Sequence, residues 1–88
     1  MFYVLSGSVS INRHGQTLRV MKEREYFGEM SMLLNALRTA DAVAAENGTQ
    51  LVAISQDNFE TILREEPKIV ISILKEMALR LKTTNEYL

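Results

Sequence analysis

The chain has 88 residues, of which 47% are hydrophobic and 24% charged, and its formal net charge is −1 at pH 7. A chain of this length is at most one domain, and it buries roughly 60–65% of the surface that its unfolded form exposes. The nearly balanced charge argues against nucleic acid as the main partner, because binding a phosphate backbone needs a basic face.

The sequence also lacks the residues typical of disulfide-bonded, zinc-binding, membrane-spanning and catalytic proteins. The chain has no cysteine and a single histidine, His14, so neither a disulfide framework nor a zinc site is expected. No apolar run reaches about 18 residues, and no signal-peptide pattern opens the chain, so we expect a cytoplasmic protein without a membrane segment. No acid–base pair, nucleophile constellation or metal cluster stands out, which argues against an enzyme.

The first 54 residues carry the short, alternating pattern of β-strands. Residues 1–5 (MFYVL) are rich in side chains that favour strands. Val9–Asn12 and Thr17–Met21 alternate apolar and polar side chains, and a turn-forming segment with Gly15 separates them. These two segments are predicted to pair as a hairpin.

A second hairpin is predicted further along the chain. Thr39–Ala45 is a strand pattern made of small residues, and Thr49–Ile54 is a more apolar one. Between them stands Asn47-Gly48, a pair that favours tight hairpin turns. We therefore predict that these two strands pair with each other.

From Ser55 onward the apolar positions follow a helical period. Ser55 is a candidate N-cap for one helix, and Pro67 suits the first turn of a second. The second helix has an apolar stripe that is predicted to pack on the sheet, made of Ile69, Val70, Ile73, Leu74, Met77, Ala78 and Leu81. Its polar residues are predicted to lie mostly on the other side: Lys68, Ser72, Lys75, Glu76, Arg80 and Lys82. The fold class is therefore mainly β with C-terminal helices.

The stretch Tyr26–Ala42 is not typical of a core segment. Gly28 precedes a short helical pattern, EMSMLL, and a glycine there lets a ligand approach the backbone closely. The start of that helix offers free N–H groups to an anion. Arg38 follows a loop, and its guanidinium can bind two phosphate oxygens at once. Because Glu29 would repel a phosphate in direct contact, it must bind something else, such as a hydroxyl donor.

The same residues also have a purely structural interpretation. Glu29 in a first helical turn can simply complement the helix dipole. Glu29 and Arg38 can also form a mutual surface salt bridge, worth under about 1 kcal/mol. The pattern alone leaves these alternatives open.

The stretch FGEMSMLL…LRTADAVAAE, within residues 27–46, resembles the phosphate-binding cassette of the cyclic nucleotide-binding domain family. This family includes the catabolite activator protein and the regulatory domains of cyclic-nucleotide-dependent kinases. The flanks YVLSGSVSI and LVAISQDNFETILREEP resemble the family's strand–Gly–strand hairpin and its last strand with the following helix. The resemblance covers essentially all 88 residues and implies a jelly roll, a double-stranded β-helix.

The resemblance implies roles for individual residues. Glu29 would accept a hydrogen bond from the ribose 2′-hydroxyl of a cyclic nucleotide, and Arg38 would pair with its cyclic phosphate. Gly28 and the backbone of Met30 and Ala40 would donate N–H groups or allow close approach. The implied ligand is cAMP or cGMP, with cAMP favoured and no metal involved.

Three positions qualify this assignment. Thr39 matches a position that varies among Ala, Ser and Thr, and its hydroxyl can reach the phosphate or a guanine amino group, which leaves cGMP open. Leu37 stands where the family usually has Pro, so the loop is expected to be less rigid. Asp41 stands where many members have Thr or Ser, and strand alternation counted from Arg38 predicts that it points away from the site.

The resemblance also predicts what the jelly roll lacks. Family domains normally have a helix and further strands before the segment that matches residues 1–8, so residues 1–88 are predicted to form a single, incomplete domain. An uncovered strand edge at Met1–Leu5 is one candidate contact for a homodimer. The C-terminal helix, with Met77 and Leu81, is another.

Two functions are consistent with the sequence. In the first, the chain is a regulatory sensor whose cassette binds a cyclic nucleotide and whose C-terminal helices relay the binding. In the second, it is a structural or interaction module that keeps the fold without binding nucleotide. Arg38 discriminates between them, because only the first needs its guanidinium.

Overall fold

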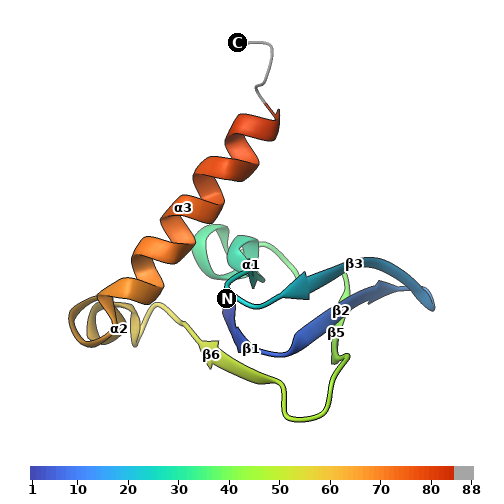
Figure 1. Cartoon of the computed structure of the whole chain (residues 1–88). Helices are drawn as coiled ribbons and strands as arrows, with labels where there is room; N and C mark the ends of the chain where they lie inside the picture. Colours follow the sequence, from blue (N-terminus) through green and yellow to red (C-terminus); the bar gives the residue numbers. More distant parts are fainter. Residues whose placement is uncertain (85–88) are drawn as a thin grey trace.

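The computed structural model describes residues 1–84, which form six strands and three helices (Figure 1). In chain order the elements are β1 (Phe2–Ser6), β2 (Ser8–Arg13), β3 (Gln16–Lys22), β4 (Tyr26–Phe27), α1 (Glu29–Leu34), β5 (Asp41–Ala44), β6 (Gln50–Ala53), α2 (Phe59–Glu65) and α3 (Pro67–Thr84). The predicted class, mainly β with C-terminal helices, is confirmed.

The strands form two antiparallel three-stranded sheets, one in the order β4-β1-β6 and the other in the order β3-β2-β5. The chain leaves the first sheet and enters the second at Gly7, whose φ of 84° few other residues adopt. Along the chain, β1, the β2–β3 pair, β4, β5 and β6 alternate between the two sheets, as expected for part of a jelly roll.

The predicted hairpin between β2 and β3 is confirmed. Val9 lies opposite Met21 and Asn12 lies opposite Thr17. The two residues of its loop, His14 and Gly15, have φ values of 52° and 76°. Two positive φ values in a two-residue loop fit the right-handed twist of the strands.

The second predicted hairpin is wrong. β5 pairs with β2 in one sheet, and β6 pairs with β1 in the other. Residues 45–49 therefore connect the two sheets, and Gly48 turns the chain there with a φ of 77°. Thr49 lies at the end of this connection, and its Oγ1 is 2.8 Å from the Glu46 carbonyl and 3.2 Å from the Ser8 carbonyl. A turn signal specifies a change of direction but not the strand that becomes the partner.

The predicted uncovered edge at Met1–Leu5 is also wrong. β1 is the central strand of its sheet, paired with both β4 and β6. Within residues 1–84, β5 and β6 each pair along one side only, and every residue of β5 is exposed. The N-terminal strand therefore offers no free edge for a homodimer.

Two apolar clusters hold the elements together. One lies between the sheets and consists of Val4, Val9 and Met21, with Ile11 and Phe27 packed against it. The other joins the β4-β1-β6 sheet to the helices and consists of Met1, Tyr3, Tyr26, Ile54 and Ile73, with further apolar side chains around it. The second cluster sets the position of α3 on the sheet.

The helices depart from the predicted pattern at two points. α2 begins at Phe59 rather than just after Ser55, because Ser55 and Asn58 bind each other's backbone N–H groups in a preceding turn. In α3 only part of the apolar stripe is covered, since Leu74 and Leu81 are 59% and 62% exposed. Figure 1 shows α3 extending beyond the sheets. Within residues 1–84, no helix is both long enough and apolar enough to span a membrane.

Candidate functional site

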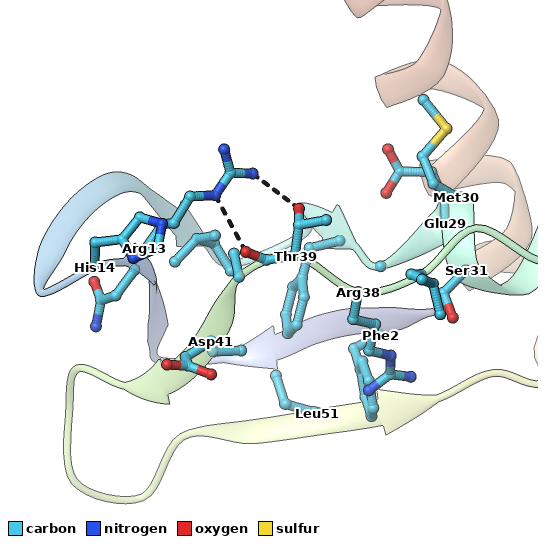
Figure 2. Close-up of a pocket in the computed structure, with 17 residues that line it drawn as sticks. Phe2, Arg13, His14, Glu29, Met30, Ser31, Arg38, Thr39, Asp41 and Leu51 are labelled. Atoms are coloured by element: carbon cyan, nitrogen blue, oxygen red, sulfur yellow. Dashed lines mark hydrogen bonds between the residues drawn. The ribbon is translucent and has the colours of Figure 1, made fainter.

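A cavity of about 900 Å³ opens where the two sheets, α1 and the segment before β5 meet (Figure 2). Phe2 and Phe27 line it from one sheet, and Arg13 and Ala42 line it from the other. The cavity is within the range of small-molecule sites. All six residues predicted to bind a ligand line it: Gly28, Glu29, Met30, Arg38, Thr39 and Ala40.

The Gly-Glu end of the site is positioned by the step from β4 into α1. Gly28 precedes the helix with a φ of 76°, a conformation that strains any residue carrying a Cβ. The helix begins at Glu29 as predicted, and Met30 is 59% exposed at the cavity rim. The backbone of this turn is therefore accessible from the cavity.

Arg38 also lines the cavity, in the segment without regular secondary structure that precedes β5. Its Cζ lies 5.4 Å from the ring centroid of Phe2, and Phe2 in turn stacks on Phe27 with the ring centroids 5.4 Å apart. A guanidinium over an aromatic face is attracted by the ring quadrupole. The two rings thus hold a solvent-exposed cation against the cavity wall.

Thr39 is fixed by a residue outside the cassette. Arg13, the last residue of β2, donates from Nε to the Thr39 carbonyl at 3.1 Å and from Nη2 to the Thr39 Oγ1 at 2.8 Å. Figure 2 shows both bonds and the side chains of Arg13 and Thr39. The backbone and the hydroxyl of Thr39 are therefore both tied to β2.

Glu29 is paired with Arg80 of α3. The Arg80 Nη1 lies 3.3 Å from the Glu29 Oε1, and both side chains are 25% exposed. Arg80 also donates from Nη2 to the Tyr26 carbonyl at 2.7 Å, and its Cζ lies 3.8 Å from the centroid of the Tyr26 ring. Within residues 1–84 Glu29 forms no ion pair with Arg38, so the alternative of a mutual Glu29–Arg38 salt bridge does not hold.

Tyr26 lies beneath this ion pair and is only 2% exposed. Burial raises the pKa of its phenol, the charge of Arg80 opposes that rise, and the charge of Glu29 adds to it. The phenol consequently stays neutral to a higher pH than an exposed tyrosine.

Asp41 is among the lining residues, but so is its neighbour Ala42, whose side chain lies on the other face of β5, so the direction of the Asp41 side chain stays a prediction. The expectation assumed that strand alternation starts at Arg38. However, β5 begins only at Asp41, where it pairs with Asn12. Asp41 is exposed to solvent.

Two residues of the site were not predicted from the sequence. Arg13 carries no local signal, because its partner Thr39 lies 26 residues away. Arg80 was placed on the polar side of its helix, yet it follows buried Ile73 by seven positions and Met77 by three. Those spacings put all three on one face, and this is the signal that could have found it.

Comparison with known proteins identifies the fold. A family model described as "Cyclic nucleotide-binding domain" matches residues 1–66. This chain belongs to the cyclic nucleotide-binding domain family. In this cyclic nucleotide-binding domain, the cassette helix α1 precedes β5, and the two C-terminal helices follow β6, as the sequence resemblance implied.

Relatives of this cyclic nucleotide-binding domain include regulators and channels. The chain is 32% identical to the "Cyclic AMP receptor protein" of Thermus thermophilus over 87 residues. It is 34% identical to the "Potassium/sodium hyperpolarization-activated cyclic nucleotide-gated channel 2" of Mus musculus over 67 residues. The matches cover 93% and 76% of this chain but only 40% and 8% of those proteins.

Solved structures show the same fold. The catabolite activator protein of Thermus thermophilus superposes with a TM-score of 0.64 at 33% identity, covering 98% of this chain and 42% of that one. A protein of a cyclic-GMP-dependent signalling pathway that regulates bacterial phytopathogenesis has a TM-score of 0.61 at 25% identity, covering 93% and 68%. The relatives thus include one named for cAMP and one from a cGMP pathway.

Proposed function

We propose that this domain binds a cyclic nucleotide in the cavity, with cAMP preferred over cGMP, and relays the binding to α3. The observation that carries the proposal is that Glu29 and Arg38 both line one cavity in a chain of this family. The proposed ligand is bound through protein groups, without a metal ion.

The proposed roles follow from the geometry of each group. Arg38 is exposed and free to turn its fork toward a cyclic phosphate, with the Phe2 ring supporting its planar face. Glu29 has one oxygen engaged by Arg80, so its other oxygen can accept a hydrogen bond from the ribose 2′-hydroxyl. Gly28, Met30 and Ala40 bring accessible backbone to the same cavity.

Arg80 supports the proposed relay to α3. It offsets the charge of Glu29, which would otherwise repel a bound phosphate, and it connects Glu29 to the last helix. Its Nε is buried without a hydrogen-bond partner, and a buried unpaired donor costs about 1–3 kcal/mol. A ligand that binds Glu29 and changes the Glu29–Arg80 contact can shift the population of docked helix.

We also propose that α3 is the contact for a homodimer. Four of its large apolar side chains are at least half exposed: Ile71, Leu74, Leu79 and Leu81. An exposed apolar helix face favours burial against a second helix. Sedimentation of the chain beside a Leu74→Glu, Leu81→Glu variant tests this contact, and an unchanged molecular mass would contradict it.

Calorimetric titration tests the proposed ligand. The chain is titrated with cAMP, cGMP and 5′-AMP, and we expect binding of the cyclic nucleotides and little of 5′-AMP. Arg38→Ala is expected to lower the affinity by about 100-fold, since a charge-assisted bidentate pair is lost. Arg38→Lys keeps the positive charge but not the planar guanidinium, so it should lose less affinity than Arg38→Ala.

Arg64→Ala is the matched control, because Arg64 is an exposed arginine on α2, outside the cavity. It should bind as the unmodified chain does. Circular dichroism verifies that each variant is folded. If the folded chain releases no heat with either cyclic nucleotide, it is an interaction module rather than a sensor.

A further inference from the structure

Arg13 is the strongest unassigned feature of the cavity. It lies at the end of β2, outside residues 27–46, and both of its hydrogen bonds go to one residue, Thr39. Two donors of a planar guanidinium hold the carbonyl and the hydroxyl of Thr39 at once, an arrangement that an ammonium group cannot reproduce. The pair fixes the orientation of the Thr39 side chain beside Arg38.

The contact determines how the Thr39 hydroxyl can interact. A threonine hydroxyl has one O–H donor and two acceptor lone pairs. Because the Arg13 Nη2 occupies a lone pair at 2.8 Å, the O–H proton is directed away from Arg13. A cationic donor at the oxygen also polarises the O–H bond and strengthens it as a donor. Thr39 is thereby set to donate a hydrogen bond.

This matters for the choice of nucleotide. An oxygen of a cyclic phosphate is an acceptor, and it matches a donating hydroxyl. The exocyclic amino group of guanine is a donor, and it needs an acceptor at that position. Adenine has no such group at the same ring carbon. A hydroxyl that already accepts from a guanidinium keeps its O–H donor but only one lone pair, so it is a better partner for phosphate than for guanine.

We infer that Arg13 is a positioning residue that commits Thr39 to the phosphate and so favours cAMP over cGMP. The inference rests on the proposed function, since it describes the same cavity. Arg13 need not touch the ligand, because it acts through the hydroxyl that it holds.

The test compares both nucleotides in the same variants by calorimetry. Arg13→Ala is expected to lower the affinity for cAMP by about fivefold, the effect of about one hydrogen bond. The affinity for cGMP should stay within about twofold, because the freed lone pair can now accept from the guanine amino group. The cAMP-to-cGMP preference should therefore fall by about fivefold.

Thr39→Ala provides the second arm of a double-mutant cycle. If Arg13 acts through Thr39, adding Arg13→Ala to Thr39→Ala should cause no further loss of cAMP affinity. Arg13→Lys should restore only part of the preference. Arg64→Ala, which removes a charge far from the cavity, should leave the preference unchanged.

Four results would overturn the inference. An equal loss for both nucleotides in folded Arg13→Ala would indicate a merely structural role. A preference for cGMP that Arg13→Ala abolishes would indicate direct contact of Arg13 with guanine. If the unmodified chain binds nucleotide but its preference does not depend on Arg13, only this inference fails. If the unmodified chain binds neither nucleotide, the proposed function fails with it.

Discussion

Arg80, near the end of α3, reaches back to Glu29, the first residue of α1, with 3.3 Å between Nη1 and Oε1. The two residues are 51 positions apart in the sequence. The same guanidinium donates to the Tyr26 carbonyl, so Arg80 contacts both sides of the turn at Gly28. The last helix is thus connected directly to the residue proposed to bind the ribose.

Removing Arg80 should weaken both nucleotide binding and its effect on α3. Arg80→Ala leaves the Glu29 charge unopposed, and we expect the cAMP affinity to fall by about three- to tenfold. Hydrogen exchange in residues 74–84 should slow on adding cAMP to the unmodified chain but not to the variant. Lys75→Ala, on the same helix, is the control. Equal protection of α3 in Arg80→Ala would contradict the relay.

Changing Glu29 to Gln should affect ribose recognition more than folding. A hydrogen bond to a charged acceptor is stronger than one to a neutral amide, so we expect about a tenfold loss for cAMP. The variant's affinity for 2′-deoxy-cAMP should fall by about twofold or less, since this nucleotide lacks the hydroxyl that donates to Glu29. The free energy of unfolding should fall by only about 1 kcal/mol. Equal loss for both nucleotides would refute the role assigned to Glu29, and Glu65→Gln is the control.

Gly7 and Gly15 form a matched pair for a test of stability. Both have positive φ, 84° and 76°. A Cβ added at Gly7 would lie 2.8 Å from the Cα of Thr49 and collide with it, whereas a Cβ added at Gly15 would have no atom within 4 Å. Gly15→Ala should therefore cost about 1–2 kcal/mol for backbone strain alone. Gly7→Ala should cost about 3 kcal/mol or more, as measured by urea unfolding. Similar costs would show that Thr49 yields without penalty.

Tyr26 should make stability fall at alkaline pH. Its folded-state pKa is raised above the ordinary value of 10.0, mainly by burial. The unfolded chain therefore loses the phenol proton first, and this part of the stability is present below about pH 10 and is lost as pH rises through the folded pKa. Tyr26→Phe keeps the ring under Arg80, so its free energy of unfolding should equal that of the unmodified chain at about pH 8. Above about pH 10, the free energy of unfolding should fall less steeply in the variant. Parallel urea-unfolding curves for the two chains across that range would contradict the prediction.

Local patterns predicted the local structure well. Residues 29–34 form a helix with the predicted bounds, because the glycine before them and the apolar run act within one turn. The β2–β3 hairpin follows from alternation and a two-residue loop. The family motif also predicted that Glu29 and Arg38 would line one cavity.

Contacts between distant segments were harder to predict. The Asn47-Gly48 signal was correct about a turn, but the pairing of β5 and β6 depends on which sheet each strand joins. The hydrogen bonds of Arg13 join segments that no short-range pattern connects. A surface arginine has no distinctive period, so its partner becomes known only once the tertiary structure brings the two together.

The placement of the cavity between two sheets has a consequence for the search for ligands. Glu29 continues directly from the sheet of β4, whereas Arg38 leads into the sheet of β5. A molecule that binds both would connect the end of β4 to the segment before β5 non-covalently, and the folded state would melt at a higher temperature when saturated. Small anions that bind Arg38 alone would raise the melting temperature much less. Thermal-shift screening would therefore distinguish compounds that bind both residues from simple counterions.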